Sequence, residues 1–347
     1  MTAQATDARA TQARATPLLA VEDVDVVLGR GWRANHVLSS VDLKIWPGEI
    51  VGLVGETGSG KTTLARTVVG LVKPRKGRVV VNGTEVSGLR RGALREERRR
   101  GHVQLVFQDP LRSLDPDLTV AQIVGEGLVI RGGIGSKEID ERVTAALRQV
   151  GLDATLLSRT SGQISGGQRQ RVSIARALAT DPELLLCDEP VSALDASNRN
   201  YILRLLGELR DSLGLPVVII SHDLSSLAGI ADRVAVLYRG RIVEDGPVGQ
   251  VFTAPRHPYT ALLMASAPSV KHDRPLDVHQ LRRTAADPEP PTAANACVFA
   301  ARCPFAVSEC AEQPALEAVG EGWTAACRRH EEWPALASAR RSNPTLA

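Results

Sequence analysis

Residues 51–63 read VGLVGETGSGKTT, and this stretch decides the fold of the chain. The apolar run Val51–Val54 predicts a short buried strand, and the apolar spacing of Leu64–Val72 predicts a helix. Between them lies G-x-x-x-x-G-K-T, which forms a P-loop when a strand precedes it and a helix follows it. Its backbone N–H groups and the N-terminus of the helix then surround phosphate groups. The sequence therefore predicts a nucleoside triphosphate site.

The P-loop assigns particular roles to two side chains. Lys61 is expected to reach the β- and γ-phosphates, and the Thr62 hydroxyl to ligate Mg²⁺. The residues predicted to bind the nucleotide here are Gly55, Glu56, Thr57, Gly58, Ser59, Gly60, Lys61, Thr62 and Thr63.

Length and composition fit an ordinary globular protein of one or two domains. The chain has 347 residues, 43% of them apolar, and a net charge of +3, which gives no argument for a nucleic-acid partner. Its apolar runs are strand-sized, far below the roughly 18–20 residues of a membrane span. Residues 1–16 lack the apolar stretch of a signal peptide and are predicted to be a disordered leader. We therefore expect a cytosolic protein, which a partner must hold in place if it works at a membrane.

The order of predicted elements indicates an α/β fold. Residues 18–45 alternate as two or three antiparallel strands with a loop at 29–35. After residue 50, strands alternate with helices, which predicts a mainly parallel sheet with an antiparallel subdomain beside it. The further predicted strands are 102–107, 184–188, 217–221, 233–238 and 241–244, and the further predicted helices are 120–132, 138–150, 169–178 and 198–213. The arginine-rich segment 89–100 is interpreted as a solvated helix face.

A second element of the phosphate site is the apolar strand that ends in Asp188-Glu189-Pro190. A carboxylate at this strand end suits Mg²⁺, directly or through water, so Asp188 is a predicted metal ligand. Glu189 points to the other side, where an attacking water needs a general base.

A second anion-binding helix start follows residue 164. Ser165 is a predicted N-cap, and the two glycines after it expose backbone N–H groups. One nucleotide cannot easily occupy both this site and the P-loop. The segment Ile164–Gln168 resembles the signature motif of ABC ATPases, which faces the P-loop of a second ATPase domain, although that motif usually begins with leucine. The residues that would act on the partner's site are Ser165, Gly166, Gly167, Gln168 and, in the D-loop described next, Asp195.

Other segments resemble ABC ATPase motifs in the expected order between Val21 and about Phe252. Gln108 is similar to the Q-loop glutamine, which implies a ligand to Mg²⁺ and water that also couples to a membrane partner. Ser192–Asp195 is similar to the D-loop at the dimer interface, and His222 to the switch histidine that contacts the γ-phosphate. The family usually stacks adenine on an aromatic side chain where this chain has Val27 and Leu28. Trp32 is the nearest substitute, with a surface tryptophan as the alternative.

Two segments narrow the resemblance to ATPases of oligopeptide and dipeptide importers. Residues 106–116 are similar to their long Q-loop, with Asp115 in place of an asparagine, and residues 255–263 are similar to the His-Pro-Tyr segment that opens their C-terminal extension. The predicted organisation is a leader at 1–16, an ABC ATPase domain at 17–253 with a helical subdomain at about 109–180, an extension at 254–335 and a disordered tail at 336–347.

Four cysteines gather in the predicted extension: Cys297, Cys303, Cys310 and Cys327. Disulfides are not expected in a reducing cytosol, so four clustered thiols indicate a soft metal. Their spacing is not the paired C-x-x-C of zinc ribbons and fits an iron–sulfur cluster better. Resemblance to the importer subfamily implies [4Fe–4S], with Zn²⁺ or free thiols as alternatives. Cys187 is interpreted as a core residue.

The resemblance implies the ATP-hydrolysing subunit of an importer for di- or oligopeptides. Glu189, His222 and Lys61 are the expected catalytic residues, and ATP and Mg²⁺ the expected ligands. The implied partners are a second ATPase subunit (a paralogue or a second copy), two membrane permease subunits and an extracytoplasmic solute-binding protein. Alternatives are import of nickel chelates, opines or sugars, a soluble ABC ATPase acting on ribosomes or DNA, and a degenerate regulatory subunit.

Overall fold

The computed structural model describes residues 16–29, 31–192, 194–266 and 277–340. Of the predicted leader, all but Thr16 lies outside the described residues, and so does the side chain of Trp32. The strands are β1 (Leu19–Leu28), β2 (Asn35–Ile45), β3 (Ile50–Val54), β4 (Lys76–Val81), β5 (Thr84–Glu85), β6 (Val103–Val106), β7 (Leu184–Asp188), β8 (Val217–Ser221), β9 (Arg233–Tyr238), β10 (Arg241–Pro247), β11 (Glu317–Gly320) and β12 (Trp323–Ala325). The helices are α1 (Lys61–Val68), α2 (Arg91–Arg100), α3 (Pro110–Ser113), α4 (Val120–Arg131), α5 (Ser136–Gln149), α6 (Gly166–Leu178), α7 (Ala196–Leu213), α8 (Val248–Thr253), α9 (Pro258–Ser266), α10 (Val278–Leu281) and α11 (Trp333–Arg340).

Two sheets form the framework of the molecule. The larger has eight strands in the order β11-β12-β10-β9-β3-β8-β7-β6, and the smaller has four in the order β2-β1-β4-β5. Strands β9, β3, β8, β7 and β6 are parallel, whereas β10, β12 and β11 are added in antiparallel fashion. The prediction of a mainly parallel sheet with an antiparallel subdomain is confirmed.

Strand β3 is buried on both faces, which explains its nearly continuous apolar sequence. Ile50 and Val54 belong to a core shared with the helical part and the C-terminal extension. Val51 and Leu53 belong to the opposite core, which also contains residues of β1, β2 and α1. The P-loop therefore follows a strand that is packed on both faces. Helix α1 ends at Val68 rather than at the expected Val72, and Gly70 follows it with φ of 72°.

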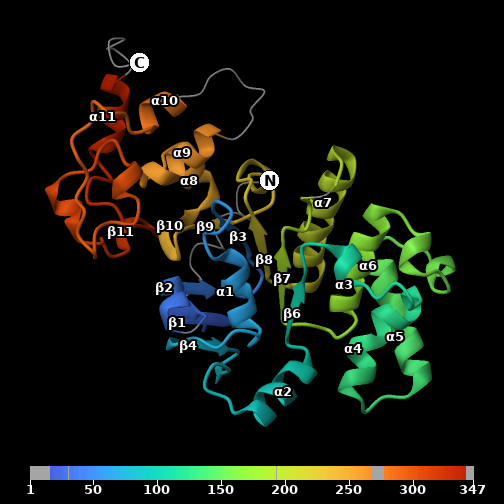
Figure 1. The fold of residues 1–347 in the computed structure, drawn as a ribbon. Coiled ribbons are helices and arrows are strands. Elements are labelled where there is room, and N and C mark those ends of the chain that lie inside the picture. Colours follow the sequence, from blue (N-terminus) through green and yellow to red (C-terminus); the bar gives the residue numbers. More distant parts are fainter. Residues whose placement is uncertain (1–15, 30, 193, 267–276, 341–347) are drawn as a thin grey trace.

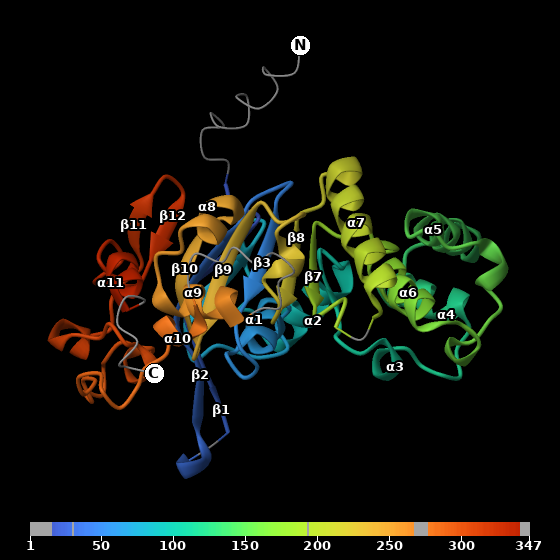
Figure 2. The same cartoon turned by 90° about the horizontal axis from the view of Figure 1, so that it is seen from above.

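The molecule has three parts side by side (Figures 1 and 2). Helices α3 to α6, from Pro110 to Leu178, form the helical part on one side of the large sheet. The small sheet and α1 lie at the centre, and the C-terminal extension lies at the opposite side, next to β10.

The C-terminal extension continues the large sheet instead of forming a separate unit. Its hairpin β11–β12 pairs with β10 through Glu244↔Ala325 and Asp245↔Thr324. The prediction of a disordered tail from residue 336 is wrong for 336–340, because α11 runs to Arg340 and buries Trp333 and Ala337. Residues 341–347 of that predicted tail lie outside the described residues.

Candidate active site

The P-loop follows β3, and two of its glycines are required by their surroundings. A Cβ atom at Gly55 would lie 2.1 Å from the carbonyl oxygen of Leu237, a distance that no side chain tolerates. Gly60 is the N-cap of α1 with φ of 109°, in a region that L-residues rarely adopt. The loop can therefore fold back tightly over the start of α1, as a phosphate-binding loop must.

Lys61 is the first residue of α1 and is buried, with 6% of its surface exposed. Its Nζ donates hydrogen bonds to the carbonyl oxygens of Gly55 (2.7 Å) and Glu56 (3.0 Å). Burial lowers the pKa of Lys61, and the nearby carboxylates of Glu189, Asp188 and Glu56 oppose this shift. The ammonium group is thus held against the loop by two of its carbonyl oxygens.

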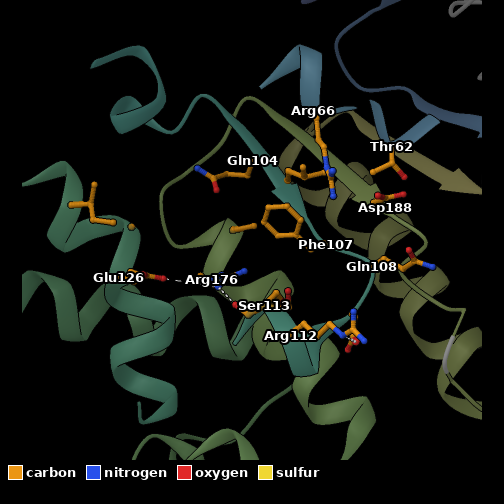
Figure 3. A pocket seen from close by; sticks show the side chains of 16 residues that line it. Thr62, Arg66, Gln104, Phe107, Gln108, Arg112, Ser113, Glu126, Arg176 and Asp188 are labelled. Carbon is orange, nitrogen blue, oxygen red and sulfur yellow. Dashed lines mark hydrogen bonds and ion pairs between the residues drawn. The ribbon is translucent and has the colours of Figure 1, made fainter. Parts of the chain in front are cut away.

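Asp188 ends β7 and is also buried. Burial raises the pKa of Asp188, and a hydrogen bond with the Thr62 side chain and the charge of Lys61 act in the opposite direction. Among the described residues, the Asp188 Oδ1 atom has no hydrogen-bond partner. A buried carboxylate oxygen without a partner, beside a threonine hydroxyl, fits a Mg²⁺ ligand set. Figure 3 shows Thr62 and Asp188 close together at one end of a cavity.

Glu189 lies one residue beyond the end of β7 and has a positive φ of 47°, which is uncommon for a residue with a side chain. Its Oε2 accepts a hydrogen bond from Gln108 Nε2 at 2.9 Å. Its Oε1 lies 3.2 Å from Nδ1 of His222. The parallel strands β6, β7 and β8 end at the same edge, so three residues predicted separately from the sequence meet here.

A cavity of about 620 Å³ separates this edge from the helical part (Figure 3). Phe107 and Gln108, from the segment after β6, line it together with Arg176 of α6. Arg176 donates a hydrogen bond to the carbonyl oxygen of Ser113 (2.7 Å) and lies 3.9 Å from the Glu126 carboxylate. These contacts join the segment after Gln108 to helices α4 and α6.

The predicted signature segment begins α6 with the expected cap. Ser165 Oγ accepts from the backbone N–H of Gln168 (3.2 Å), and the Gln168 side chain accepts from the backbone N–H of Ser165 (2.8 Å). Asp195 caps α7 by accepting from the backbone N–H of Asn198 at 3.0 Å. In Figures 1 and 2, α6 lies with the helical part and α1 beneath the centre of the large sheet. The two helix starts that are predicted to bind anions therefore belong to different parts of the molecule.

The C-terminal extension reaches the P-loop, which the sequence analysis did not predict. The Tyr259 hydroxyl accepts a hydrogen bond from the backbone N–H of Glu56 at 2.9 Å. The Arg302 guanidinium donates two hydrogen bonds to the Glu56 carboxylate, at 2.8 and 3.0 Å. These pairs are 203 and 246 residues apart, so no local pattern signals them.

All four cysteines of the extension line one small cavity. Burial raises the pKa of three of these thiols, that of Cys327 to about 12 and those of Cys303 and Cys297 in the same direction. Within the described ranges, no group of three or more histidine, cysteine, aspartate or glutamate side chains has the arrangement of a metal site. The chemistry of the donor set fits a soft metal, whereas the positions of the thiols are not those of a formed metal centre.

The fold and the site define a class of protein, the P-loop nucleoside triphosphatases. Two family models match the chain: the ABC transporter model over residues 38–192, and the C-terminal region of oligopeptide/dipeptide transporters over residues 243–310. A Brucella ovis protein whose name assigns it to peptide import and ATP binding is 42% identical over 316 residues, covering 90% of this chain and 98% of the relative. The oligopeptide transport ATP-binding protein OppF of Salmonella typhimurium is 40% identical over 291 residues, covering 82% and 86%.

Solved structures show the same fold. The ATP-binding cassette MJ0796 in a dimeric post-hydrolysis state, bound to ADP and Pi, matches with a TM-score of 0.61 and 31% identity, covering 66% of this chain and 98% of that one. The protein cbiO1 from Clostridium perfringens, part of the transporter complex cbiONQ, matches with a TM-score of 0.60 and 31% identity, covering 68% and 91%. The chain belongs to the ABC transporter family, and within it to the ATP-binding subunits of the oligopeptide/dipeptide type. No helix of the described part has the length and apolar character needed to cross a membrane.

Proposed function

We propose that this protein is the ATP-hydrolysing subunit of an ABC importer for di- and oligopeptides. The observation that carries the proposal is the meeting of Gln108, Glu189 and His222 at the edge where Lys61 lies buried under the P-loop. The match of residues 243–310 to the C-terminal region of oligopeptide/dipeptide transporters, together with the names of the relatives, supports peptide cargo.

In the proposed site, the backbone of residues 55–63 surrounds the β- and γ-phosphates. On nucleotide binding, Lys61 exchanges its contacts with the carbonyl oxygens of Gly55 and Glu56 for phosphate oxygens, which offset the unfavourable burial of its charge. Thr62, Asp188 and Gln108 are the proposed holders of Mg²⁺, which when bound neutralises charge on the β- and γ-phosphate oxygens. The unpartnered Asp188 Oδ1 supports its part in this set.

Glu189 is the proposed general base, because its carboxylate can accept a proton from the water that attacks the γ-phosphate. Gln108 and His222 each contact one of its oxygens and so fix its orientation. His222 is also the proposed contact of the γ-phosphate and would stabilise the transferred charge together with Lys61. The positive φ of Glu189 supports a functional reason for this conformation, since backbone strain concentrates at active sites.

We further propose that a complete site needs two ATPase subunits. The capped helix start at Ser165, with Gly166, Gly167 and Gln168, would face the P-loop of the second subunit, and Asp195 would lie at the interface between them. The second subunit is a paralogue or another copy of this chain.

The cavity beside Gln108 is the proposed contact with the membrane permease subunits. Phe107 lines this cavity with 36% of its surface accessible, and Leu111 of the adjacent helix α3 has 63% accessible, as suits side chains that another protein covers. Two permease subunits and an extracytoplasmic solute-binding protein would complete the importer. In this arrangement the subunit is peripheral and lies on the cytoplasmic face of the membrane.

We propose that the four cysteines of the extension bind a [4Fe–4S] cluster. All four line one cavity, and thiolate donors suit iron–sulfur clusters and zinc alike. Iron and zinc analysis of anaerobically purified protein separates the candidates. Iron with acid-labile sulfide supports the cluster, a full zinc complement without iron replaces it with zinc, and the absence of both metals indicates free thiols.

Uptake of labelled di- to pentapeptides tests the function. Cells that lack this chain are complemented with the wild type or with Glu189→Gln. Restoration by the wild type alone supports the proposal, and the length dependence defines the peptide class. Peptide uptake that does not depend on the chain contradicts the peptide assignment, and nickel-chelate and sugar uptake then test the alternative cargoes.

A further inference from the structure

Glu56 of the P-loop is held from the outside by the C-terminal extension. Its backbone N–H donates a hydrogen bond to Tyr259 Oη. Its carboxylate accepts one hydrogen bond from each of the two Nη atoms of Arg302. Its carbonyl oxygen accepts from Lys61 Nζ at 3.0 Å. One loop residue therefore connects two side chains of the extension to the lysine that is proposed to bind the phosphates.

The two side chains of the extension are themselves fixed by an aromatic cluster. The Tyr259 ring lies 4.4 Å from the ring of Tyr238 and 5.5 Å from that of Phe299, and Tyr259 is fully buried. The Arg302 guanidinium lies over the Tyr238 ring (5.6 Å) and the Phe299 ring (5.7 Å), within range of cation–π attraction. Ring packing therefore holds both groups in place, so little conformational freedom is lost in holding Glu56.

Charge gives Arg302 a second role at this position. The Glu56 carboxylate is close enough to Lys61 to act on its ammonium group. Without a partner, this carboxylate would repel a bound triphosphate, which is strongly anionic. The bidentate pair with Arg302 neutralises it and at the same time sets the direction of the side chain.

We propose that Arg302 and Tyr259 are positioning residues for ATP, through which the C-terminal extension sets the shape and the charge of the P-loop. The proposal rests on the proposed function, because it requires that residues 55–63 bind the nucleotide. It assigns the extension a part in ATP binding that is independent of any metal at its cysteines.

The test measures the dissociation constant of Mg·ATP for the purified full-length chain by isothermal titration calorimetry. Arg302→Ala is expected to raise this constant about threefold to tenfold, as for the loss of a partly exposed charge pair next to a charged ligand. Arg302→Lys is expected to restore only part of the affinity. Lysine keeps the positive charge but cannot form the bidentate pair with the Glu56 carboxylate. The matched control is Arg340→Ala, which removes a bidentate pair with Asp287 inside the extension and is expected to leave the affinity unchanged.

A second variant separates charge from general loosening of the fold. Glu56→Gln removes the negative charge that Arg302 neutralises. Adding Arg302→Ala to this variant should therefore change little, and the affinity of the double variant is expected to approach that of Glu56→Gln alone. High salt should also reduce the effect of Arg302→Ala. Tyr259→Phe keeps the ring packing, removes only the acceptor for the Glu56 N–H and is expected to weaken binding by about threefold.

The outcomes distinguish this proposal from the proposed function. Wild-type affinity for Mg·ATP in both Arg302→Ala and Tyr259→Phe overturns the inference. If Lys61→Ala loses binding in the same experiments, the proposed ATP site still holds. Equal losses in Arg302→Ala and Arg340→Ala, or additive losses in the double variant, also overturn it, because they indicate general loosening. Unchanged binding in Lys61→Ala contradicts the ATP site itself.

Discussion

Gln108 and Glu189 are joined by a hydrogen bond of 2.9 Å although 81 residues separate them in the chain. Gln108 follows β6 and Glu189 follows β7, and the parallel pairing of these strands brings their carboxyl ends together. Gln108 also lines the cavity next to the helical part. The segment after β6 therefore contacts both this cavity and the carboxylate of the proposed base.

We predict that Glu189→Gln lowers the rate of ATP hydrolysis at least about 100-fold in the assembled transporter, because the amide cannot accept the proton of the attacking water. ATP binding should persist, since the replacement has nearly the same shape. The measurement is phosphate release at saturating Mg·ATP, with nucleotide retention measured in parallel. A rate close to that of the wild type would refute the role of Glu189 as base.

The P-loop and the residues around it could be predicted because each belongs to a short local pattern. Lys61, Asp188 and Ser165 all follow from a strand end or a helix start that is visible in the sequence itself. The approach of Lys61 to Asp188 also follows from topology, because the parallel strands β3, β8 and β7 end at one edge of the sheet. The alternation of strands and helices along the sequence predicts this topology.

The place of the C-terminal extension could not be predicted in the same way. Arg302 and Glu56 pair across 246 residues, and nothing in the spacing of either residue signals the other. The strand β12 has only three residues, below the length at which a pattern of alternation can be recognised. The apolar side chains of 333–340 did offer a signal for α11, since Trp333 and Ala337 are spaced by one helical turn.

Glu244 attaches the extension to the core, and its removal should be costly. It is fully buried and accepts hydrogen bonds from the backbone N–H groups of Arg256 (2.8 Å) and His257 (2.9 Å) and from Trp323 Nε1 (3.0 Å). Glu244→Ala leaves these donors without an acceptor, so we expect the free energy of unfolding to fall by about 3 kcal/mol. Urea unfolding measures it.

The matched control for Glu244 is Glu312→Ala. Glu312 pairs with Arg328 at 3.4 Å with 81% of its side chain exposed, and its removal should change the free energy of unfolding by less than about 1 kcal/mol. Similar stabilities for the two variants would show that Glu244 does not anchor the extension.

Metal binding by the cysteines of the extension can be tested against Cys187, a cysteine of the core. Cys303→Ala removes one of the four thiols that line the cavity, whereas Cys187→Ala removes a thiol from the core beneath the ATP site. We expect the metal content of anaerobically purified protein to fall severalfold in the first variant and to stay at the wild-type level in the second. Equal metal content in both would contradict metal binding by the four cysteines of the extension.

His257 predicts a pH dependence of stability. Burial lowers its pKa from 6.5 to about 3, so the unfolded chain binds a proton at a higher pH than the folded chain does. The contribution of His257 to stability is therefore complete above pH 6.5 and is lost progressively as the pH falls toward 3. One such group changes the free energy of unfolding by at most about 1.4 kcal/mol per pH unit.

His257→Asn isolates this contribution, because an asparagine can still accept the backbone N–H of Tyr259 but does not titrate. Between pH 7 and about pH 5, the wild type should lose more stability in urea unfolding than the variant does. The carboxylate of the buried Glu244 accepts a hydrogen bond from the backbone N–H of His257 and is present in both proteins. Its own titration is therefore largely removed from the difference between the two stability profiles. Parallel pH profiles for the two proteins would mean that the imidazole is not held neutral by burial in the folded chain.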